Sequence, residues 1–264
     1  MTAKLRVLDL FSGIGGFSLG LERTGGFETV AFCEIEPFPR RVLAKHWPEV
    51  PCYDDVRTLT GDVLRRDGIA VDVITGGFPC QDLSVAGKQR GMGEGTRCGL
   101  WSEIVRLVGE LRPQYVIVEN VAALLAGPSE RRGGWFGRVL GDLAECGYDA
   151  EWENIPASAL GAPHRRERVW LVAYRPQDGN TEQSIAHPGE NGAWPEGAWE
   201  PYQLPCLFGR ARSFLQQFPT EPRIHRMVDG LSSDMDRLAA CGNAVVPQIP
   251  ELIGRAILAA RSPA

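Results

Sequence analysis

Short apolar runs alternate with amphipathic segments through the first two-thirds of the chain. Five runs have the length and the branched or aromatic content of buried strands: LRVLDLF (5–11), FETVAFCE (27–34), VDVITGG (71–77), PQYVIVENV (113–121) and VWLVAYR (169–175). Helical spacing of apolar residues predicts helices at 16–24, 37–46, 99–111 and 134–146. This alternation indicates a doubly wound α/β fold, in which helices cover both faces of a parallel sheet. The segment DAEWENI (149–155) is predicted to add one strand near the edge of that sheet.

The pattern changes after Tyr174. From residue 176 to about residue 230 the chain is rich in Pro, Gly, Trp and Gln with weak periodicity, which is typical of a small irregular lobe or a long structured insertion. Helical spacing returns in PQIPELIGRAILAA, whose apolar residues need a partner face on the first domain. The sequence therefore predicts a main domain in two pieces, 1–175 plus 238–264, interrupted by a small region at 176–237.

Composition adds few constraints. The chain has 264 residues, 44% of them hydrophobic, which is enough for one good core. We expect no membrane span, because no run of about 18 apolar residues occurs, and no signal peptide, because MTAKLRVLDLFSG turns polar early. The seven cysteines form no CxxC pair, which indicates a reduced, cytoplasmic protein without a metal site or disulfide framework. The net charge of −5 neither predicts nor excludes nucleic-acid binding, because arginines cluster locally.

Residues that could bind a cofactor follow the first two predicted strands. DLFSGIGGF places a glycine turn between a strand and a helix, where backbone N–H groups can approach a ligand. Its G-x-G-G spacing differs from the G-x-G-x-x-G of pyrophosphate cradles, and tight packing is the alternative explanation. Glu34 ends the second strand, where a carboxylate can accept both ribose hydroxyls of a nucleoside cofactor. Asp55 lies near the third strand position and is a candidate for an adenine amino group, but alone it leaves the question open.

Residues that could carry out catalysis follow the third apolar run, VDVITGG. In GGFPCQ, Cys80 lies at the carboxyl edge of the predicted sheet, where ligands of such folds bind. A lone cysteine is as often a small buried hydrophobic residue. However, Glu119 and Asn120 end a neighbouring strand, and Arg166 and Arg168 begin another, so we expect all of them at this edge. A thiol, a carboxyl group and a guanidinium at one edge form a candidate active site.

Five short motifs occur in a fixed order along the chain: DLFSGIGGF, GGFPCQDLS, ENV, HRRER and CGNAVVPQI. In type and order they resemble the DNA cytosine-C5 methyltransferase family, from residue 9 to about residue 250, with 176–228 outside the resemblance. The resemblance implies a Rossmann-like S-adenosylmethionine-dependent methyltransferase fold with a small irregular target-recognition lobe. It also implies an enzyme that moves a methyl group from S-adenosylmethionine to C5 of a flipped-out cytosine in DNA.

The resemblance assigns roles to individual residues. By the family pattern, the Cys80 thiolate adds to cytosine C6, Glu119 hydrogen-bonds N3 and the exocyclic amine, and Arg168, with Arg166 close by, stabilises the activated base. A larger set matches family positions near the cofactor: Phe11, Gly13, Ile14, Gly16, Glu34, Ile35, Asp55, Val56, Gly77, Pro79, Leu100, Asn243 and Ala244. Ile35 stands where many members carry an aromatic residue that stacks on the adenine, which predicts a weaker contact.

The glycine-rich segment after Cys80 suits a closing loop. Because the target carbon lies inside the base stack, the nucleotide has to be flipped out, and a loop with cations can meet the phosphates. The expected DNA contacts are Gln81, Ser84, Lys88, Arg90 and Arg97. A plain surface loop is the alternative.

The sequence departs from the family pattern at two further places. His164 replaces a more usual glutamine, and the arginine-rich motif that usually precedes GNxV is not recognisable.

Three other functions compete with this one. An RNA (tRNA) cytosine-C5 methyltransferase would share the chemistry, but that group carries a Cys-Phe-Thr tripeptide that is absent here. A catalytically silent DNA-binding relative would be expected to lose Cys80, Glu119 or Arg168. An NAD-dependent oxidoreductase leaves PCQ and ENV unexplained. We expect double-stranded DNA as the partner, a monomer, a possible cognate restriction endonuclease, and a cytoplasmic location in a prokaryotic or phage-infected cell.

Overall fold

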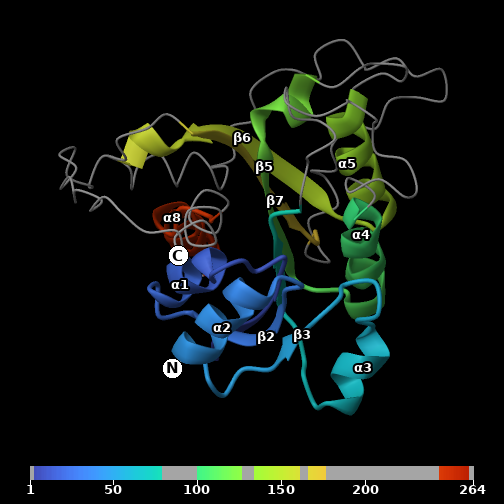
Figure 1. Cartoon of the computed structure of the whole chain (residues 1–264). Coiled ribbons are helices and arrows are strands. Elements are labelled where there is room, and N and C mark those ends of the chain that lie inside the picture. The colour runs from blue at the N-terminus through green and yellow to red at the C-terminus, as the bar shows by residue number, and fades with distance from the viewer. Residues whose placement is uncertain (1–2, 79–99, 127–133, 161–165, 177–243, 262–264) are drawn as a thin grey trace, which may run out of the picture.

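The computed structural model describes residues 3–78, 100–126, 134–160, 166–176 and 244–261, which form one seven-stranded sheet with helices on both faces (Figure 1). The strands are β1 (Leu5–Leu10), β2 (Phe27–Cys33), β3 (Cys52–Tyr53), β4 (Val73–Gly76), β5 (Tyr115–Val121), β6 (Asp149–Pro156) and β7 (Glu167–Tyr174). The helices are α1 (Gly16–Glu22), α2 (Pro37–His46), α3 (Gly61–Arg66), α4 (Leu100–Leu111), α5 (Gly134–Glu145) and α8 (Gln248–Arg261). Two 3₁₀ segments follow strands: η2 (Ala122–Ala126) and η3 (Ala157–Leu160).

The strand order is β3-β2-β1-β4-β5-β7-β6. The first five strands pair in parallel, in agreement with the alternation of apolar runs and helices in the sequence. β7 lies between β5 and β6 and is antiparallel to both. The prediction of a parallel sheet is therefore wrong for this strand, and the sheet is mixed. The reversal follows from chain length, because the residues between β6 and β7 are too few for the crossover that a parallel neighbour needs.

Each face of the sheet carries its own hydrophobic core. On one face α4 and α5 pack against strand residues such as Leu8 and Val116, around the buried indole of Trp101. On the other face α1 and α8 pack against Val7 and Ile117. Consecutive residues of one strand thus face opposite cores, which explains why the strands read as continuous apolar runs in the sequence.

Most predicted elements are confirmed within a few residues. α2, α4 and α5 match the predicted helices, and the segment predicted at 149–155 forms β6 at the edge of the sheet. β3 and α3 were not predicted, because a two-residue strand and a six-residue helix are too short to show a period. At the start of α3 the Thr60 hydroxyl accepts a hydrogen bond from the Val63 amide. This N-cap was not predicted from the sequence.

Helix α8 lies along α1 with glycines at the contact (Figure 1). A Cβ at Gly20 would stand 2.1 Å from the Pro247 carbonyl oxygen, and one at Gly16 would stand 2.5 Å from that of Val245. Since neither position has space for a methyl group, these glycines allow the backbone before α8 to approach α1. The helix predicted at 247–260 therefore completes the core beneath α1, while the division into two domains stays a prediction.

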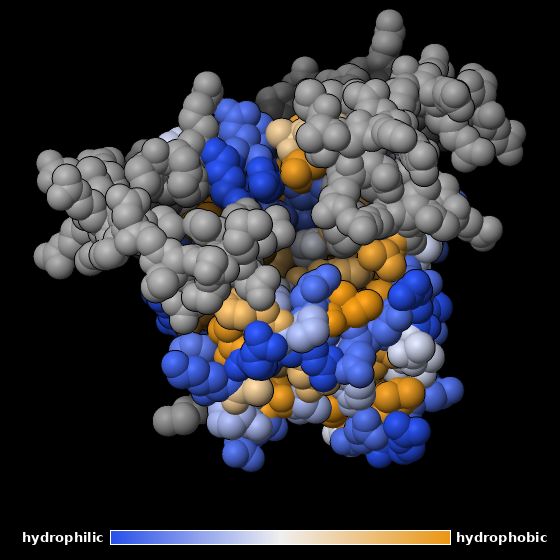
Figure 2. Space-filling model, in the orientation of Figure 1, coloured by the Kyte–Doolittle hydropathy of each residue, from blue (hydrophilic) through white to orange (hydrophobic). Residues whose placement is uncertain are grey.

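Hydrophobic and hydrophilic side chains are interspersed on the described surface in Figure 2. Four large hydrophobic side chains are exposed among the described residues: Leu19, Ile35, Leu125 and Trp152. None of the described helices is long and apolar enough to cross a membrane. Of the four exposed residues, only Ile35 belongs to the set that the sequence assigns to a cofactor.

The α1–α8 contact predicts opposite effects for two glycine substitutions. Gly20→Ala is expected to lower the free energy of unfolding by about 1–3 kcal/mol, because its methyl group overlaps the Pro247 carbonyl. Gly141→Ala, in α5, meets nothing within 4 Å and is expected to raise it by up to about 1 kcal/mol. Urea unfolding followed by circular dichroism measures both. Equal effects of the two variants would contradict the tight contact.

Candidate active site

The predicted site residues gather at the carboxyl edge of the parallel strands. Phe11, Glu34 and Gly77 directly follow β1, β2 and β4, and Glu119 lies near the end of β5. Arg168 lies at the start of β7 and reaches the same edge because β7 runs in the opposite direction. The topology therefore brings together a set of residues that are far apart in the sequence.

A carboxyl–guanidinium pair forms the centre of this edge. Glu119 continues the face of Ile117, and Arg168 continues that of Trp170, the residue paired with Glu119 in register. The Arg168 Nε lies 3.0 Å from the Glu119 Oε1, and the two side chains are only 24% and 12% exposed. Burial raises the pKa of the Glu119 carboxyl above its ordinary value, against the opposing effect of Arg168 and Arg166. Glu119 is thus closer to protonation at neutral pH than an exposed glutamate.

The backbone that leads to Cys80 is held against this pair. A Cβ at Gly77 would stand 3.3 Å from the Glu119 Oε2, so glycine allows the chain to pass close to the carboxyl group. The buried Asn120 donates from Nδ2 to the Phe78 carbonyl oxygen at 3.1 Å and accepts from the Val121 amide at 2.8 Å. β5 therefore fixes the last described residues before Cys80 as well as supplying the carboxyl group.

Arg166 connects the same edge to the segment before α8. Its Nη2 donates to the Ala244 carbonyl oxygen at 2.9 Å, and its backbone φ is +29°. Burial and the neighbouring Arg168 lower the pKa of Arg166, whereas Glu119 raises it. Two guanidinium groups thus surround one carboxyl group, and one of them also holds Ala244, a residue assigned to the cofactor.

Glu34 is fixed by backbone amides. Its Oε2 accepts from the Gly13 amide at 2.7 Å and its Oε1 accepts from the Glu36 amide at 2.8 Å, and the residue is 8% exposed. Each carboxylate oxygen keeps acceptor capacity for a further donor. The Gly13 amide therefore orients a carboxylate, whereas the sequence assigned the amides of this turn to a ligand.

The turn after β1 bends through left-handed backbone conformations. Phe11 has φ +53°, which is unusual for a residue with a side chain, and Gly13 and Gly15 have φ +53° and +85°. A Cβ at Gly13 would meet nothing within 4 Å, whereas at Gly16 it would overlap Val245. Gly13 thus borders open space beside Glu34, whereas Gly16 serves the packing against the chain before α8.

Other residues that the family pattern assigns to the cofactor lie after β2, in the β3–α3 connection and at the start of α4. The Asp55 carboxylate accepts hydrogen bonds from the Arg57 backbone amide and guanidinium, the shortest at 2.7 Å. Val56 is buried, Ile35 is 58% exposed, and Leu100 is the half-buried first residue of α4. The exposure of Ile35 leaves space at the position that the family pattern assigns to stacking on the adenine.

Asp9 is a buried group that the sequence reading missed. It is fully buried in β1, and it accepts hydrogen bonds from the Ser18 hydroxyl at 2.9 Å and from the Thr75 hydroxyl at 2.7 Å. Burial is the main cause that raises its pKa to about 7, despite these donors. An acid within the apolar run LRVLDLF was the available signal, because an ionisable residue there has to find partners.

Several predicted site residues lie outside the described residues: Pro79, Cys80, Gln81, Ser84, Lys88, Arg90, Arg97 and Asn243. His164 and residues 177–237 of the predicted recognition region also lie outside them. Their assignments remain predictions. Across the ranges that the structure covers, no group of three or more His, Cys, Asp or Glu is placed to hold a metal ion.

A solved structure shares this architecture. The putative DNA modification methyltransferase encoded within a prophage of E. coli matches with a TM-score of 0.54 and 29% identity, over 65% of this chain and 47% of that chain. Strand order and this match together define a Rossmann-like S-adenosylmethionine-dependent methyltransferase fold. The fold class implied by the five motifs is confirmed.

The chain belongs to the C-5 cytosine-specific DNA methylase family, whose model matches residues 5–198. The Type II methyltransferase M2.BsuMI of Bacillus subtilis is 36% identical over 173 residues, which cover 64% of this chain and 42% of the relative. M.Sau3AI of Staphylococcus aureus is 36% identical over 197 residues, 69% of this chain and 46% of the relative. The chain thus spans less than half the length of these relatives.

The raised pKa of Asp9 predicts how stability depends on pH. The folded protein holds this proton up to about pH 7, whereas the unfolded chain releases it near pH 3.8, so stability falls as pH rises between these values. Each pKa unit corresponds to about 1.4 kcal/mol. Asp9→Asn is expected to remove this part of the decline, measured by urea unfolding at several pH values.

Ser18→Ala is a control that should change the pH dependence of stability in the opposite direction to Asp9→Asn. It keeps the titrating carboxyl but removes one hydroxyl donor that stabilises the charged form, so the decline should extend to higher pH. An Asp9→Asn protein with the same pH profile as the wild type would show that Asp9 does not titrate in this range.

Proposed function

We propose that the chain is an S-adenosylmethionine-dependent DNA (cytosine-5-)-methyltransferase. The observation that carries this proposal is the Glu119–Arg168 pair, a carboxyl group with a raised pKa that lies 3.0 Å from a guanidinium nitrogen and against Gly77. Cys80 follows Gly77 by three residues, so the sequence provides a thiol close to the point where the backbone contacts this pair. Membership of the family supports the same function.

The residues of the edge suit the activation of cytosine. C5 is a poor nucleophile, and addition of the Cys80 thiolate to C6 moves the ring electron pair towards C5. A protonated Glu119 donates to N3 and accepts from the exocyclic amine, which stabilises the ring as that charge develops. Arg168 fixes the Glu119 carboxyl and adds positive charge beside it. After transfer, a base takes the C5 proton, the electron pair of that C–H bond re-forms the C5–C6 double bond, and the Cys80 thiolate leaves C6, which restores the aromatic ring and the free thiolate.

The other end of the edge suits the cofactor. Glu34, held by the Gly13 and Glu36 amides, would accept hydrogen bonds from the ribose hydroxyls, and Asp55 would accept one from the adenine amino group. The open space at Gly13 and the exposed Ile35 leave room for the nucleoside. When bound, S-adenosylmethionine supplies an electrophilic methyl group.

Double-stranded DNA is the proposed substrate. The family description and the name of the E. coli prophage methyltransferase refer to DNA, and the sequence lacks the Cys-Phe-Thr tripeptide of the tRNA group. Base flipping, contacts from Gln81, Ser84, Lys88, Arg90 and Arg97, and pairing with a restriction endonuclease belong to the same proposal. Methyl transfer to tRNA alone remains the competing outcome.

Substitution of the nucleophile tests the proposal. Cys80→Ser is expected to lower transfer of labelled methyl groups from S-adenosylmethionine to duplex DNA by at least about 1,000-fold. Wild-type protein should also form an adduct with 5-fluorocytosine DNA that survives a denaturing gel, because fluorine at C5 cannot leave as a proton. Cys146→Ser, at a half-buried thiol after α5, is the control and should retain both activities.

Two outcomes would contradict the proposal. Label in tRNA but not in DNA would replace DNA as the substrate, and full turnover by Cys80→Ser would exclude the covalent mechanism. No label in any nucleic acid would favour the catalytically silent relative.

The exposed position of Ile35 predicts a gain of affinity. Ile35→Phe is expected to bind S-adenosylhomocysteine about two- to tenfold more tightly, because an aromatic ring there can stack on the adenine. Isothermal titration calorimetry measures the change, with Trp152→Phe on β6 as the control that should bind like the wild type. Unchanged or weaker binding by Ile35→Phe would place the adenine elsewhere.

A further inference from the structure

The residues assigned to the adenine lie on a turn with little regular structure of its own. Asp55 and Val56 stand between β3, which has two residues, and α3. The Asp55 carbonyl oxygen accepts from the Thr58 and Leu59 amides at 3.1 Å each and from the Thr58 hydroxyl at 3.0 Å. These bonds close the turn on itself. Its orientation towards the sheet edge therefore depends on what packs against it.

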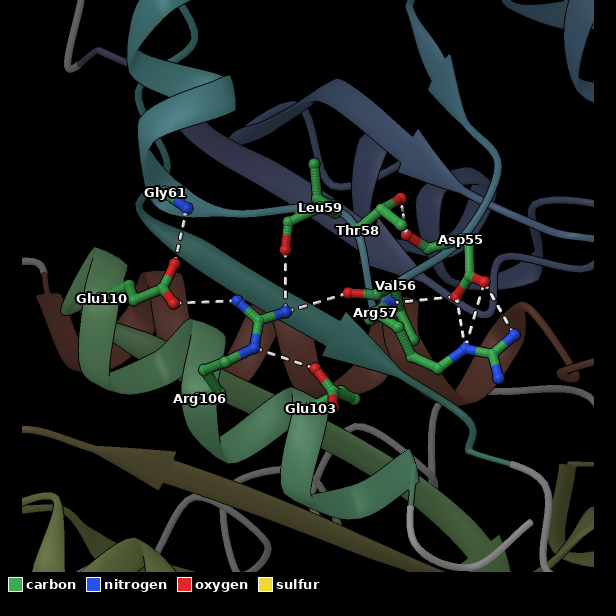
Figure 3. Close-up of polar contacts among 9 residues, drawn as sticks. All are labelled: Asp55, Val56, Arg57, Thr58, Leu59, Gly61, Glu103, Arg106 and Glu110. Atoms are coloured by element: carbon green, nitrogen blue, oxygen red, sulfur yellow. Dashed lines mark hydrogen bonds and ion pairs between the residues drawn. The ribbon is translucent and has the colours of Figure 1, made fainter. Parts of the chain in front are cut away.

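The side chain of Arg106, on α4, reaches this turn (Figure 3). Its Nη2 donates to the Val56 carbonyl oxygen at 2.9 Å and to the Leu59 carbonyl oxygen at 2.8 Å. Its Nη1 donates to Glu110 and its Nε donates to Glu103, both at 2.8 Å. The planar guanidinium thus bridges two backbone carbonyls and two carboxylates. A lysine ammonium could not reproduce this set of contacts.

Glu110 adds a second connection between α4 and the same segment. Its Oε2 accepts from the Gly61 amide at 2.6 Å, while its Oε1 accepts from Arg106 (Figure 3). Burial opposes the charged form, but these donors outweigh it and hold the pKa of Glu110 below its ordinary value. α4 therefore holds both the middle and the end of the β3–α3 connection.

α4 is itself a rigid support. Its inner side chains are fully buried against the sheet: Trp101, Ile104, Leu107 and Val108. Its first residue, Leu100, is also assigned to the cofactor. An ordinary surface ion pair would contribute little to stability and nothing to ligand choice. Arg106 differs because it satisfies carbonyl groups of two residues, Val56 and Leu59, whose side chains are buried.

The Asp55 carboxylate has limited capacity for another donor. An ionised carboxylate has about four acceptor positions. The Arg57 amide, Nε and Nη2 already donate to it (Figure 3). A small displacement of the turn would therefore decide whether the remaining acceptor position faces an adenine amino group.

We propose that Arg106 is a positioning residue that presents the Asp55 carboxylate to the 6-amino group of the cofactor's adenine and so sets the preference for an adenosyl over an inosyl ligand. This inference rests on the proposed function. It assigns to α4, through Arg106, the choice of base at the cofactor end of the site.

Calorimetry on the full chain with two ligands tests the inference. S-adenosylhomocysteine carries the 6-amino group, and S-inosylhomocysteine carries a 6-oxo group that a carboxylate repels. Wild-type protein is expected to prefer the adenosyl ligand by at least about tenfold. Arg106→Gln is expected to lose about tenfold in affinity for the adenosyl ligand and less than about threefold for the inosyl ligand, so the preference collapses.

Two further variants complete the design. Arg106→Lys keeps the positive charge between Glu103 and Glu110 but loses the planar guanidinium. Its preference for the adenosyl ligand should therefore be intermediate, and this variant tests the inference even if Arg106→Gln folds poorly. Arg255→Gln removes an arginine that pairs with Glu251 at 2.8 Å within α8, and should keep the wild-type preference. Thermal unfolding of each protein without ligand reports on the folded fraction.

The outcomes separate the inference from the proposed function. An unchanged preference in both Arg106 variants, or an equal loss for both ligands, would overturn the positioning role while wild-type binding still supports the cofactor. A wild-type protein that binds neither ligand would overturn the proposed function and the inference together.

Discussion

The reversed direction of β7 is the constraint on which the candidate active site depends. Hydrogen bonding to β5 places Trp170 opposite Glu119, and the start of β7 then brings Arg168 to the carboxyl edge. A parallel strand at this position would carry the same arginine to the opposite edge. Because the pair is largely buried, loss of either partner would leave an uncompensated group in a medium that solvates charge poorly. Backbone pairing thus determines side-chain chemistry.

Three carboxyl groups near the edge are held by three different kinds of donor. Hydroxyl groups hold Asp9, backbone amides hold Glu34, and a guanidinium holds Glu119. Hydroxyls leave the buried Asp9 with a pKa of about 7, and burial outweighs the arginines at Glu119, whose pKa is also raised. The partners that each strand end supplies therefore give chemically similar side chains different environments.

Residue patterns predicted the parts of the fold that rest on long periodic segments. The apolar runs located the major strands, and the positions of Glu34, Glu119 and Arg168 at the ends of these runs placed them at one edge. The direction of β7 was not predicted, because an apolar run reads the same in both directions of pairing. The use of the Gly13 amide by Glu34, and the reach of Arg106 to two carbonyls, were also not predicted. Such contacts depend on where short irregular turns lie in space, and no period in the sequence records this.

The position of α8 has a consequence for synthesis of the chain. Ribosomes release the N-terminal strands and α1 long before α8, yet Ile253 and Ile257 of α8 share a core with Phe17 and Leu21 of α1. Until translation passes these residues, the apolar face of α1 lacks its cover and is open to aggregation or chaperone binding. A nascent chain can assemble the α4–α5 face first, whereas the face that carries Gly16 and Asp9 has to wait for the last helix of the described chain.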